Sequence, residues 1–146
     1  MKVVVANDHG AVKEAQRVLE HLKKRNIEFT YIGTDKEESI DYPLQAEKAV
    51  VEFRKGGYDF GILLCGTGIG ISISANKMEG IRCALPQDKY AAEMTKKHNA
   101  SNFIAFGGRV EYKESIEEIL DAYIDAEFEG GRHQRRIDMM MALSGK

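Results

Sequence analysis

Short apolar segments alternate with amphipathic helical segments along the whole chain, and this alternation restricts the fold more than any other feature. The expected strands cover residues 3–6, 29–32, 60–64, 81–85 and 102–106. Apolar residues recur at helical spacing over 12–22, 42–53, 88–97 and 116–124, and a further helix is expected to run through 76–77. Strands that alternate with helices form right-handed βαβ units and a parallel sheet. We therefore predict an α/β fold, a Rossmann-like three-layer α/β/α sandwich around a mostly parallel five-stranded sheet.

The length of 146 residues suits one domain, 1–146, with a basic tail at about 128–146 that is helical over 132–141. The net charge of −2, without a basic stripe interleaved with aromatic residues, argues against nucleic acid as a partner. A run of 18 apolar residues and a signal-peptide pattern are both absent from the sequence, so no membrane association is expected. The two cysteines have no CxxC partner, which predicts neither a disulfide framework nor a zinc site and favours a reducing cytoplasm.

A glycine-rich segment, residues 65–72 (CGTGIGIS), follows the apolar run 60–64. Strands buried on both faces are apolar throughout, and ligands of open α/β sheets bind beyond the carboxyl ends of strands. Glycines at alternate positions let backbone N–H groups approach an anion closely. A dinucleotide fingerprint is disfavoured because Gly70 comes one position too early, and the Gly-Lys-Ser/Thr of a Walker loop is missing. A tight turn without a ligand is the simpler alternative.

Cys65 stands where the expected strand meets the glycine segment. Backbone amides and a helix N-terminus beside a thiol favour its thiolate form, which can act as a base or a nucleophile. Free cysteines are also among the most buried residues and are often inert. This second interpretation is preferred for Cys83, which falls inside an expected strand, and a role for Cys83 stays open.

Two histidines and three arginines supply further candidates. His9 and His98 lie at chain turns, and histidine suits proton transfer because it titrates near neutrality. Arg109 follows Gly-Gly at a strand end, and Arg132 and Arg136 are four residues apart, so on a helix they share a face and can bind one phosphate. Capping histidines and a solvated basic tail are the alternatives. A thiol, histidines, an amide cradle and arginines together suit proton transfer on a small phosphorylated carbonyl compound, with the amides stabilising an oxyanion.

These residues lie in segments that match a known family. The chain resembles the RpiB/LacAB sugar-phosphate isomerases, and within them the type B ribose-5-phosphate isomerases. The matching segments are 7–10 (NDHG), 33–34 (GT), 41–43 (DYP), 65–72 (CGTGIGIS), 75–77 (ANK), 80–82 (GIR), 98–99 (HN), 106–110 (FGGRV) and 129–136 (EGGRHQRR). Asn7, where Ser or Cys is common, and Ser74, where Ala is frequent, depart from the family pattern without touching an assigned role.

The resemblance implies an aldose–ketose isomerase that interconverts D-ribose 5-phosphate and D-ribulose 5-phosphate through an enediolate, with no cofactor and no metal. Cys65 matches the catalytic base, and His98 the residue that opens the furanose ring, with Thr67 assisting. The matching substrate-binding positions are Asp8, His9, Gly66, Gly68, Ile69, Gly70, Asn99, Arg109, Arg132 and Arg136, the three arginines on the phosphate side. The resemblance also implies a homodimer or homotetramer with shared active sites, in which His98 and Asn99 act on the partner's Cys65.

Alternatives remain within and outside this class. A six-carbon substrate, such as allose 6-phosphate or galactose 6-phosphate, is the nearest rival. Galactose-6-phosphate isomerase subunits tend to lack the His-Asn pair and the Gly-Gly-Arg-His-x-x-Arg tail, which this chain has. Family members with a glutamate base are excluded by Cys65 and Ser72. A non-catalytic phosphosugar sensor is the rival from another class, but a sensor has no use for the base.

Overall fold

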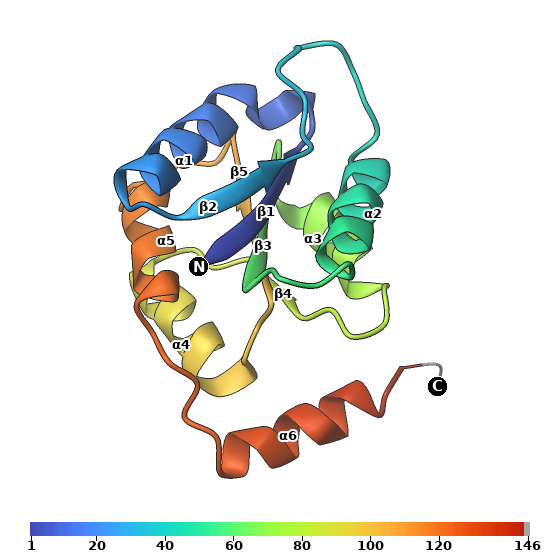
Figure 1. Cartoon of the computed structure of the whole chain (residues 1–146), viewed down its shortest axis with the longest axis vertical. Helices are drawn as coiled ribbons and strands as arrows, with labels where there is room; N and C mark the ends of the chain where they lie inside the picture. Colours follow the sequence, from blue (N-terminus) through green and yellow to red (C-terminus); the bar gives the residue numbers. More distant parts are fainter. Residues whose placement is uncertain (145–146) are drawn as a thin grey trace.

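The computed structural model describes residues 1–144, in which helices and strands alternate as predicted (Figure 1). The elements are β1 (Lys2–Asn7), the 3-10 turn η1 (His9–Ala11), α1 (Val12–Lys24), β2 (Glu28–Tyr31), α2 (Tyr42–Phe53), β3 (Phe60–Cys65), α3 (Ile69–Asn76), β4 (Cys83–Ala84), α4 (Lys89–Asn99), β5 (Phe103–Gly107), α5 (Ile116–Ile124) and α6 (Arg132–Met141).

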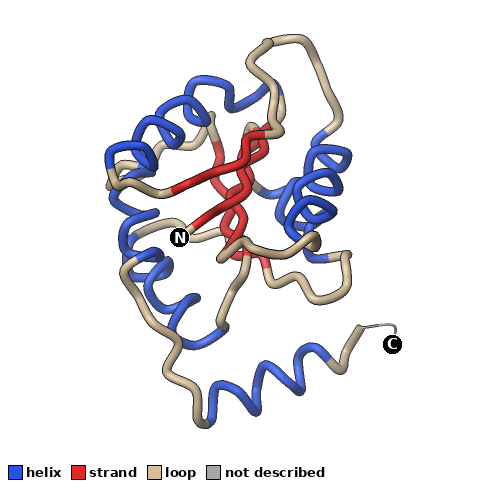
Figure 2. Tube along the Cα trace, viewed as in Figure 1, coloured by secondary structure: helices blue, strands red, loops and turns tan. Residues whose placement is uncertain are grey.

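The strands form one sheet in the order β2-β1-β3-β5-β4, at the centre of the molecule in Figure 2. Every pairing is parallel; Val5 lies opposite Ile62, for example, and Cys65 opposite Gly107. The predicted sheet is therefore confirmed.

Helices cover both faces of the sheet (Figure 1). On one face Val3, Val5 and Leu64 pack against α1, α4 and α5, and on the other Val4 and Leu63 pack against α2 and α3. Neighbouring residues of a strand point to opposite faces, so a strand covered on both sides needs apolar residues at every position. The three-layer sandwich explains why β3 is buried along its whole length.

Strand β4 is shorter than the predicted 81–85. It pairs only with β5, as an edge strand, and only Cys83 and Ala84 take part. Side chains satisfy the neighbouring amides: Arg82 N donates to Asn102 Oδ1 (2.8 Å) and Cys83 N to Asn76 Oδ1 (2.7 Å). These bonds replace part of the ladder that the apolar pattern predicts.

Helix α4 runs two residues beyond its predicted end. Asp88 caps its start by accepting a hydrogen bond from Ala91 N (2.7 Å), and Ala100 closes it in the left-handed conformation. This extension places His98 and Asn99 in the last helical turn rather than in a loop.

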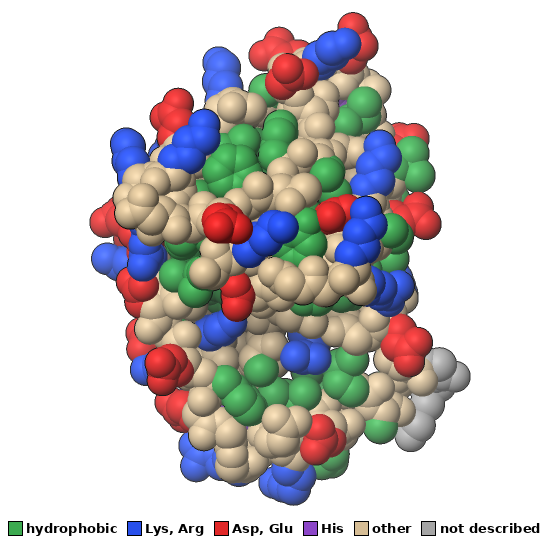
Figure 3. Space-filling model, in the orientation of Figure 1, with side chains coloured by type: hydrophobic (Ala, Val, Ile, Leu, Met, Phe, Trp, Pro, Cys, Tyr) green, Lys and Arg blue, Asp and Glu red, His purple; other side chains and the backbone are tan. Residues whose placement is uncertain are grey.

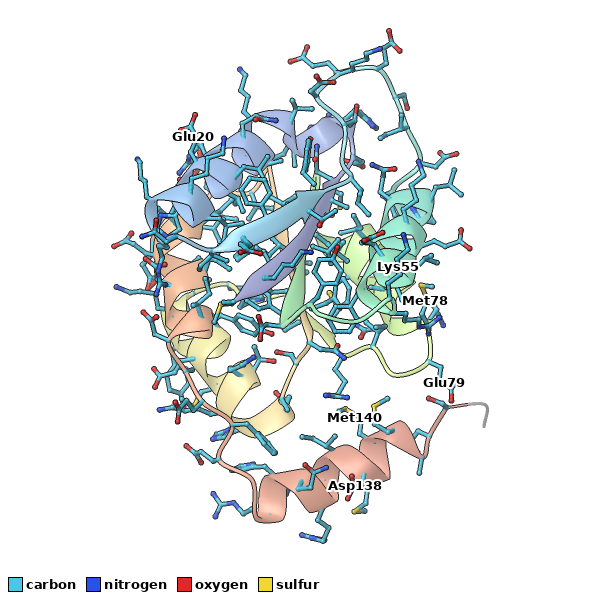
Figure 4. All side chains as sticks on the ribbon, viewed as in Figure 1. Glu20, Lys55, Met78, Glu79, Asp138 and Met140 are labelled. Atoms are coloured by element: carbon cyan, nitrogen blue, oxygen red, sulfur yellow. The ribbon has the colours of Figure 1, made fainter. Side chains whose placement is uncertain are left out.

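Helix α6 stands apart from the sandwich (Figure 1). We call residues 125–131, which lead from α5 into α6, the approach segment. This segment is bonded to α4, because Glu129 N donates to Lys97 O (3.1 Å). A groove, visible as a hollow in Figure 3, separates α6 from the body; it is lined by residues that include Arg82, Cys83 and Met140. Figure 4 shows Met140 pointing from α6 toward the body. Within residues 1–144, no helix combines the length and apolar character needed to cross a bilayer.

Candidate active site

The topology creates a crevice between β1 and β3. The chain leaves β1 into α1 on one face of the sheet, whereas it leaves β3 into α3 on the other face. Ligands of open α/β sheets bind at such switch points, beyond the carboxyl ends of the strands. The segments that follow β1 and β3 are residues 8–10 and 66–70, which include most of the predicted site residues.

Cys65 ends β3 with its thiol turned toward the glycine segment. The residue is 4% exposed, and its Sγ accepts a hydrogen bond from Gly68 N (3.1 Å). Its carbonyl accepts a hydrogen bond from Gly108 N (2.8 Å), which fixes the strand end against the loop after β5. An N–H donor aimed at sulfur stabilises a thiolate more than a thiol, so this position suits a base.

The glycine segment turns so tightly that side chains are excluded at two of its positions. Gly68 has a φ of 76°, and a Cβ there would lie 2.5 Å from Leu85 Cδ1. A Cβ at Gly70 would lie 2.6 Å from the Tyr42 ring. Thr67 Oγ1 accepts a hydrogen bond from Ile69 N (3.2 Å) at the start of α3. The segment therefore presents backbone amides beside the Cys65 thiol, an arrangement that can bind an oxyanion.

Asp8 and His9 lie beside this segment. Asp8 is 5% exposed and its Oδ1 accepts a hydrogen bond from Gly10 N (2.8 Å). A Cβ at Gly10 would lie 2.8 Å from Gly66 N, so the turn after β1 contacts the turn after β3 through bare backbone. The ring of His9 accepts a hydrogen bond at Nδ1 from Ile40 N (3.2 Å). When neutral, His9 therefore carries its proton on Nε2.

Arg109 completes the arrangement from β5. Its backbone N donates to Gly66 O (2.9 Å), and its guanidinium passes close to Gly66. Arg109 and His9 line one polar pocket together with Gly10, Lys13 and Glu37. We call Asp8, His9, Cys65, residues 66–70 and Arg109 the carboxyl-edge group.

The remaining predicted residues lie at the opposite edge of the sheet. Helix α4 ends at Asn99, just before β5 begins, whereas Cys65 is level with the last residue of β5. Strand β5 alone rises about 13 Å at roughly 3.3 Å per residue. His98, Asn99 and Arg136 line a small pocket between α4 and α6, and Arg132 begins α6. We call His98, Asn99, Arg132 and Arg136 the amino-edge group; one chain does not bring it together with Cys65.

Two residues that sequence reasoning passed over support the amino-edge group. The rings of His98 and His133 stack 4.1 Å apart at 8°, and Glu129 Oε2 lies 3.9 Å and 3.5 Å from their respective Nε2 atoms. Burial, followed by the charges of His98 and Arg132, lowers the pKa of His133. The four-residue spacing of Glu129 and His133 was the available signal in the sequence, because this spacing brings two side chains together on a helix. The two glycines between them are not typical of a helix and so weaken that signal.

Ligand atoms of Glu129, His98 and His133 lie within 4.8 Å of one another, which raises the question of a metal. Zinc needs ligands that converge on one point at about 2.0–2.2 Å. The in-plane lone pairs of two stacked, parallel imidazoles point side by side and do not converge. The cluster in this geometry does not fit an ion, and we assign no metal to it.

Asn7 also has a role that the sequence did not signal. It is fully buried; its Nδ2 donates to Asp8 O (2.9 Å) and Thr34 O (3.0 Å), and its Oδ1 accepts from Tyr31 Oη (2.9 Å). These bonds hold the Asp8 turn against the loop after β2.

Burial raises the pKa of the Cys83 thiol, which favours the inert interpretation of that residue.

Comparisons with known proteins agree with this architecture. The model of the Ribose/Galactose Isomerase family matches residues 3–140. The chain is 39% identical to ribose-5-P isomerase B of Listeria innocua over 146 residues, covering 100% of this chain and 99% of that protein. It is 39% identical over 142 residues to ribose-5-phosphate isomerase B of Escherichia coli K12, covering 97% and 95%. The structure of Clostridium thermocellum ribose-5-phosphate isomerase B superposes with a TM-score of 0.93 at 40% identity, covering 98% and 97%. The chain therefore belongs to the ribose/galactose isomerase family.

Proposed function

We propose that this protein interconverts D-ribose 5-phosphate and D-ribulose 5-phosphate. The observation that carries the proposal is the Cys65 thiol at the carboxyl end of β3, hydrogen-bonded to Gly68 N and bordered by the amides of the glycine segment. The names of the relatives from Listeria innocua and Escherichia coli support the choice of substrate.

In this proposal Cys65 transfers the proton between two carbons. The thiolate takes the proton from C2 of the open-chain aldose; the electron pair forms the C1=C2 bond, and O1 becomes an oxyanion. A proton passes from O2 to O1, the thiol returns its proton to C1, and C2=O forms. Amides of residues 66–70 stabilise the charge on the oxygens, where preorganised donors are most effective.

The ring of the cyclic aldose must open before this transfer. We assign His98 as the proton donor: the C1–O4 bond breaks, its electron pair stays on O4, and O4 takes the proton of His98. The C1 hydroxyl passes its proton through Thr67 to solvent as C1=O forms. Asp8 and Asn99 bind sugar hydroxyls. Arg109, together with His9, binds the phosphate, and so do Arg132 and Arg136, through charge-assisted hydrogen bonds.

Such a reaction needs both groups of residues, so a complete site needs two copies of the chain. We infer a homodimer, or a tetramer built from dimers, in which the amino-edge group of one copy meets the partner's Cys65. Apolar side chains are exposed beside the glycine segment and on α6, as an interface requires: Tyr42, Leu44, Val51, Ile69, Ile73, Met139 and Met140. A cytoplasmic location is part of the proposal because Cys65 must stay a free thiol.

The first test is turnover of D-ribose 5-phosphate with a chelator present, for which we expect ketose formation. If D-ribose 5-phosphate is not turned over but allose 6-phosphate or galactose 6-phosphate is, the proposed substrate changes to a six-carbon sugar phosphate. Binding of these compounds without turnover, unaffected by Cys65→Ala, would favour a sensor.

Complementation tests the shared site. Cys65→Ala and His98→Ala should each be inactive alone. After the two variants are unfolded and refolded together in equal amounts, half of the dimers are mixed, and each mixed dimer contains one intact site. We expect about a quarter of wild-type activity, as two-fold symmetry dictates. No recovery from a mixture that has refolded would contradict sharing.

A further inference from the structure

The stacked pair of His98 and His133 is asymmetric. The His98 side chain is 38% exposed, whereas that of His133 is 7% exposed. His133 therefore lies beneath His98 and covers one face of its ring, and His98 lines a pocket together with Asn99 and Arg136. A ring supported on one face is restricted in its rotation, so the stack selects one orientation of His98.

Glu129 faces the edge of both rings. Its backbone is anchored on α4 by the bond to Lys97 O, independently of α6. Its Oε2 faces Nε2 of His98 at 3.9 Å and Nε2 of His133 at 3.5 Å. At these distances the carboxylate attracts positive charge on either ring without a direct hydrogen bond to either one.

Burial and the surrounding charges both act on His133. Glu129 from the approach segment, Arg132 and Arg136 from α6 and His98 from α4 act on His133, and burial is the largest influence. The two arginines and His98 disfavour a charge on His133, whose pKa is lowered despite Glu129. Two imidazoles in contact resist carrying two charges. His98, the more exposed ring of the pair, is therefore the one placed to take up and donate a proton.

We propose that His133 and Glu129 are positioning residues for His98: the stacked ring holds the His98 ring in one orientation, and the carboxylate at its edge stabilises positive charge on it during proton transfer. The inference rests on the proposed function, in which His98 gives a proton to the ring oxygen of the sugar. The proposal also gives the Gly130-Gly131 turn a structural role, because this turn brings both Glu129 and His133 next to His98. Both glycines have positive φ, 68° and 56°, and no neighbouring atom would meet a Cβ at either one.

Three variants separate orientation from charge. His133→Ala removes the supporting face, His133→Phe keeps a flat ring but no nitrogen, and Glu129→Gln keeps the shape of the side chain but no charge. Gln134→Ala, on the exposed side of α6, is the matched control. We expect His133→Ala to lower turnover of ribose 5-phosphate about ten- to hundredfold, as misplacement of a reacting group does. We expect His133→Phe to recover part of the loss and Glu129→Gln to shift the pH profile of turnover.

A second readout distinguishes positioning from general damage. Cys65 exchanges the C1 hydrogen of ribulose 5-phosphate with deuterium from D₂O, a step that needs no ring chemistry. This exchange should be unchanged in His133→Ala while aldose formation falls. Equal loss of exchange and aldose formation in all three variants, or no loss of either, would overturn the proposal.

A third readout does not depend on turnover. In wild type the two rings stack with centroids 4.1 Å apart, so the ring current of His133 should shift the NMR signal of the His98 Cε1 proton upfield. The shift should persist in His133→Phe and disappear in His133→Ala. If the wild-type and His133→Ala signals coincide, the stack does not form in solution and the inference fails, whatever substrate the enzyme accepts.

Discussion

The carboxyl-edge group and the amino-edge group are held in place by different means. At the carboxyl edge the contacts are between backbones: Gly10 lies on Gly66, and Gly68 leaves no room for a side chain beside Leu85. At the amino edge, side chains of α4 and α6 depend on one another, as the rings of the His98–His133 stack do. The first group is formed by the sandwich itself, whereas the second depends on how α6 docks. Substitutions that disturb the packing at the first edge should therefore lower stability, whereas substitutions at the second edge should weaken binding with little effect on stability.

The largest effect on turnover should come from Cys65→Ala. It removes the base, so kcat should fall by about 10²–10⁴-fold, the contribution usual for a positioned base. The phosphate contacts do not involve the thiol, so the affinity for inorganic phosphate, measured by calorimetry, should be retained. Wild-type kcat in this variant would refute the assignment of the base.

Gly68→Ala tests the backbone packing of the carboxyl edge. Gly80→Ala is the matched control, because Gly80 also has a positive φ, 79°, but no atom lies within 4 Å of a Cβ placed there. The control should cost about 1–2 kcal/mol from the left-handed backbone alone. Gly68→Ala should cost about 1–3 kcal/mol more, because its Cβ meets Leu85 and Phe106. Equal denaturation midpoints for the two variants would mean that Leu85 and Phe106 move away from the added Cβ without lowering the free energy of unfolding.

Arg136→Ala tests the amino edge. The guanidinium lines the pocket beside His98 but is exposed, so the denaturation midpoint should not move. Loss of a charge-assisted contact to phosphate should weaken substrate binding by about 1.5–3 kcal/mol, visible as a raised KM. Arg135→Ala, at an exposed neighbouring position, is the control. If KM responds equally in both variants, α6 contributes only general positive charge.

The smallest effect should come from Tyr31→Phe, at the support of the carboxyl edge. The variant removes the hydroxyl that lies 2.9 Å from the fully buried Asn7 Oδ1 and 2.8 Å from Thr34 O, and a buried acceptor left unpaired costs about 1–3 kcal/mol. Because Asn7 also holds Asp8 O, a modest rise in KM should accompany the loss of stability, measured by urea unfolding. Stability equal to wild type would show that another donor reaches Asn7.

Local pattern was sufficient for most of the fold. The buried strand 60–65 and the helices over 12–24 and 116–124 follow from hydrophobic periodicity, because each element must bury its apolar face. The exception was β4, where Asn76 and Asn102 take hydrogen bonds that the strand would otherwise make. Hydrogen bonds from such side chains to the backbone of a strand leave no periodic pattern in the sequence, so the pattern cannot predict them. Likewise, nothing local distinguishes the buried Asn7 from an ordinary loop asparagine.

The sequence by itself determined the α/β alternation, the glycine segment after β3 and the candidate residues Cys65, His98 and Arg136, because residue type and spacing carry these signals. The tertiary structure alone decided how these residues are grouped. The order of strands brings the turns after β1, β3 and β5 to one edge, while the end of α4 places His98 at the other. Only in three dimensions do Glu129 and His133 meet His98. Distances between elements depend on packing and on the direction of each strand, which no local pattern records.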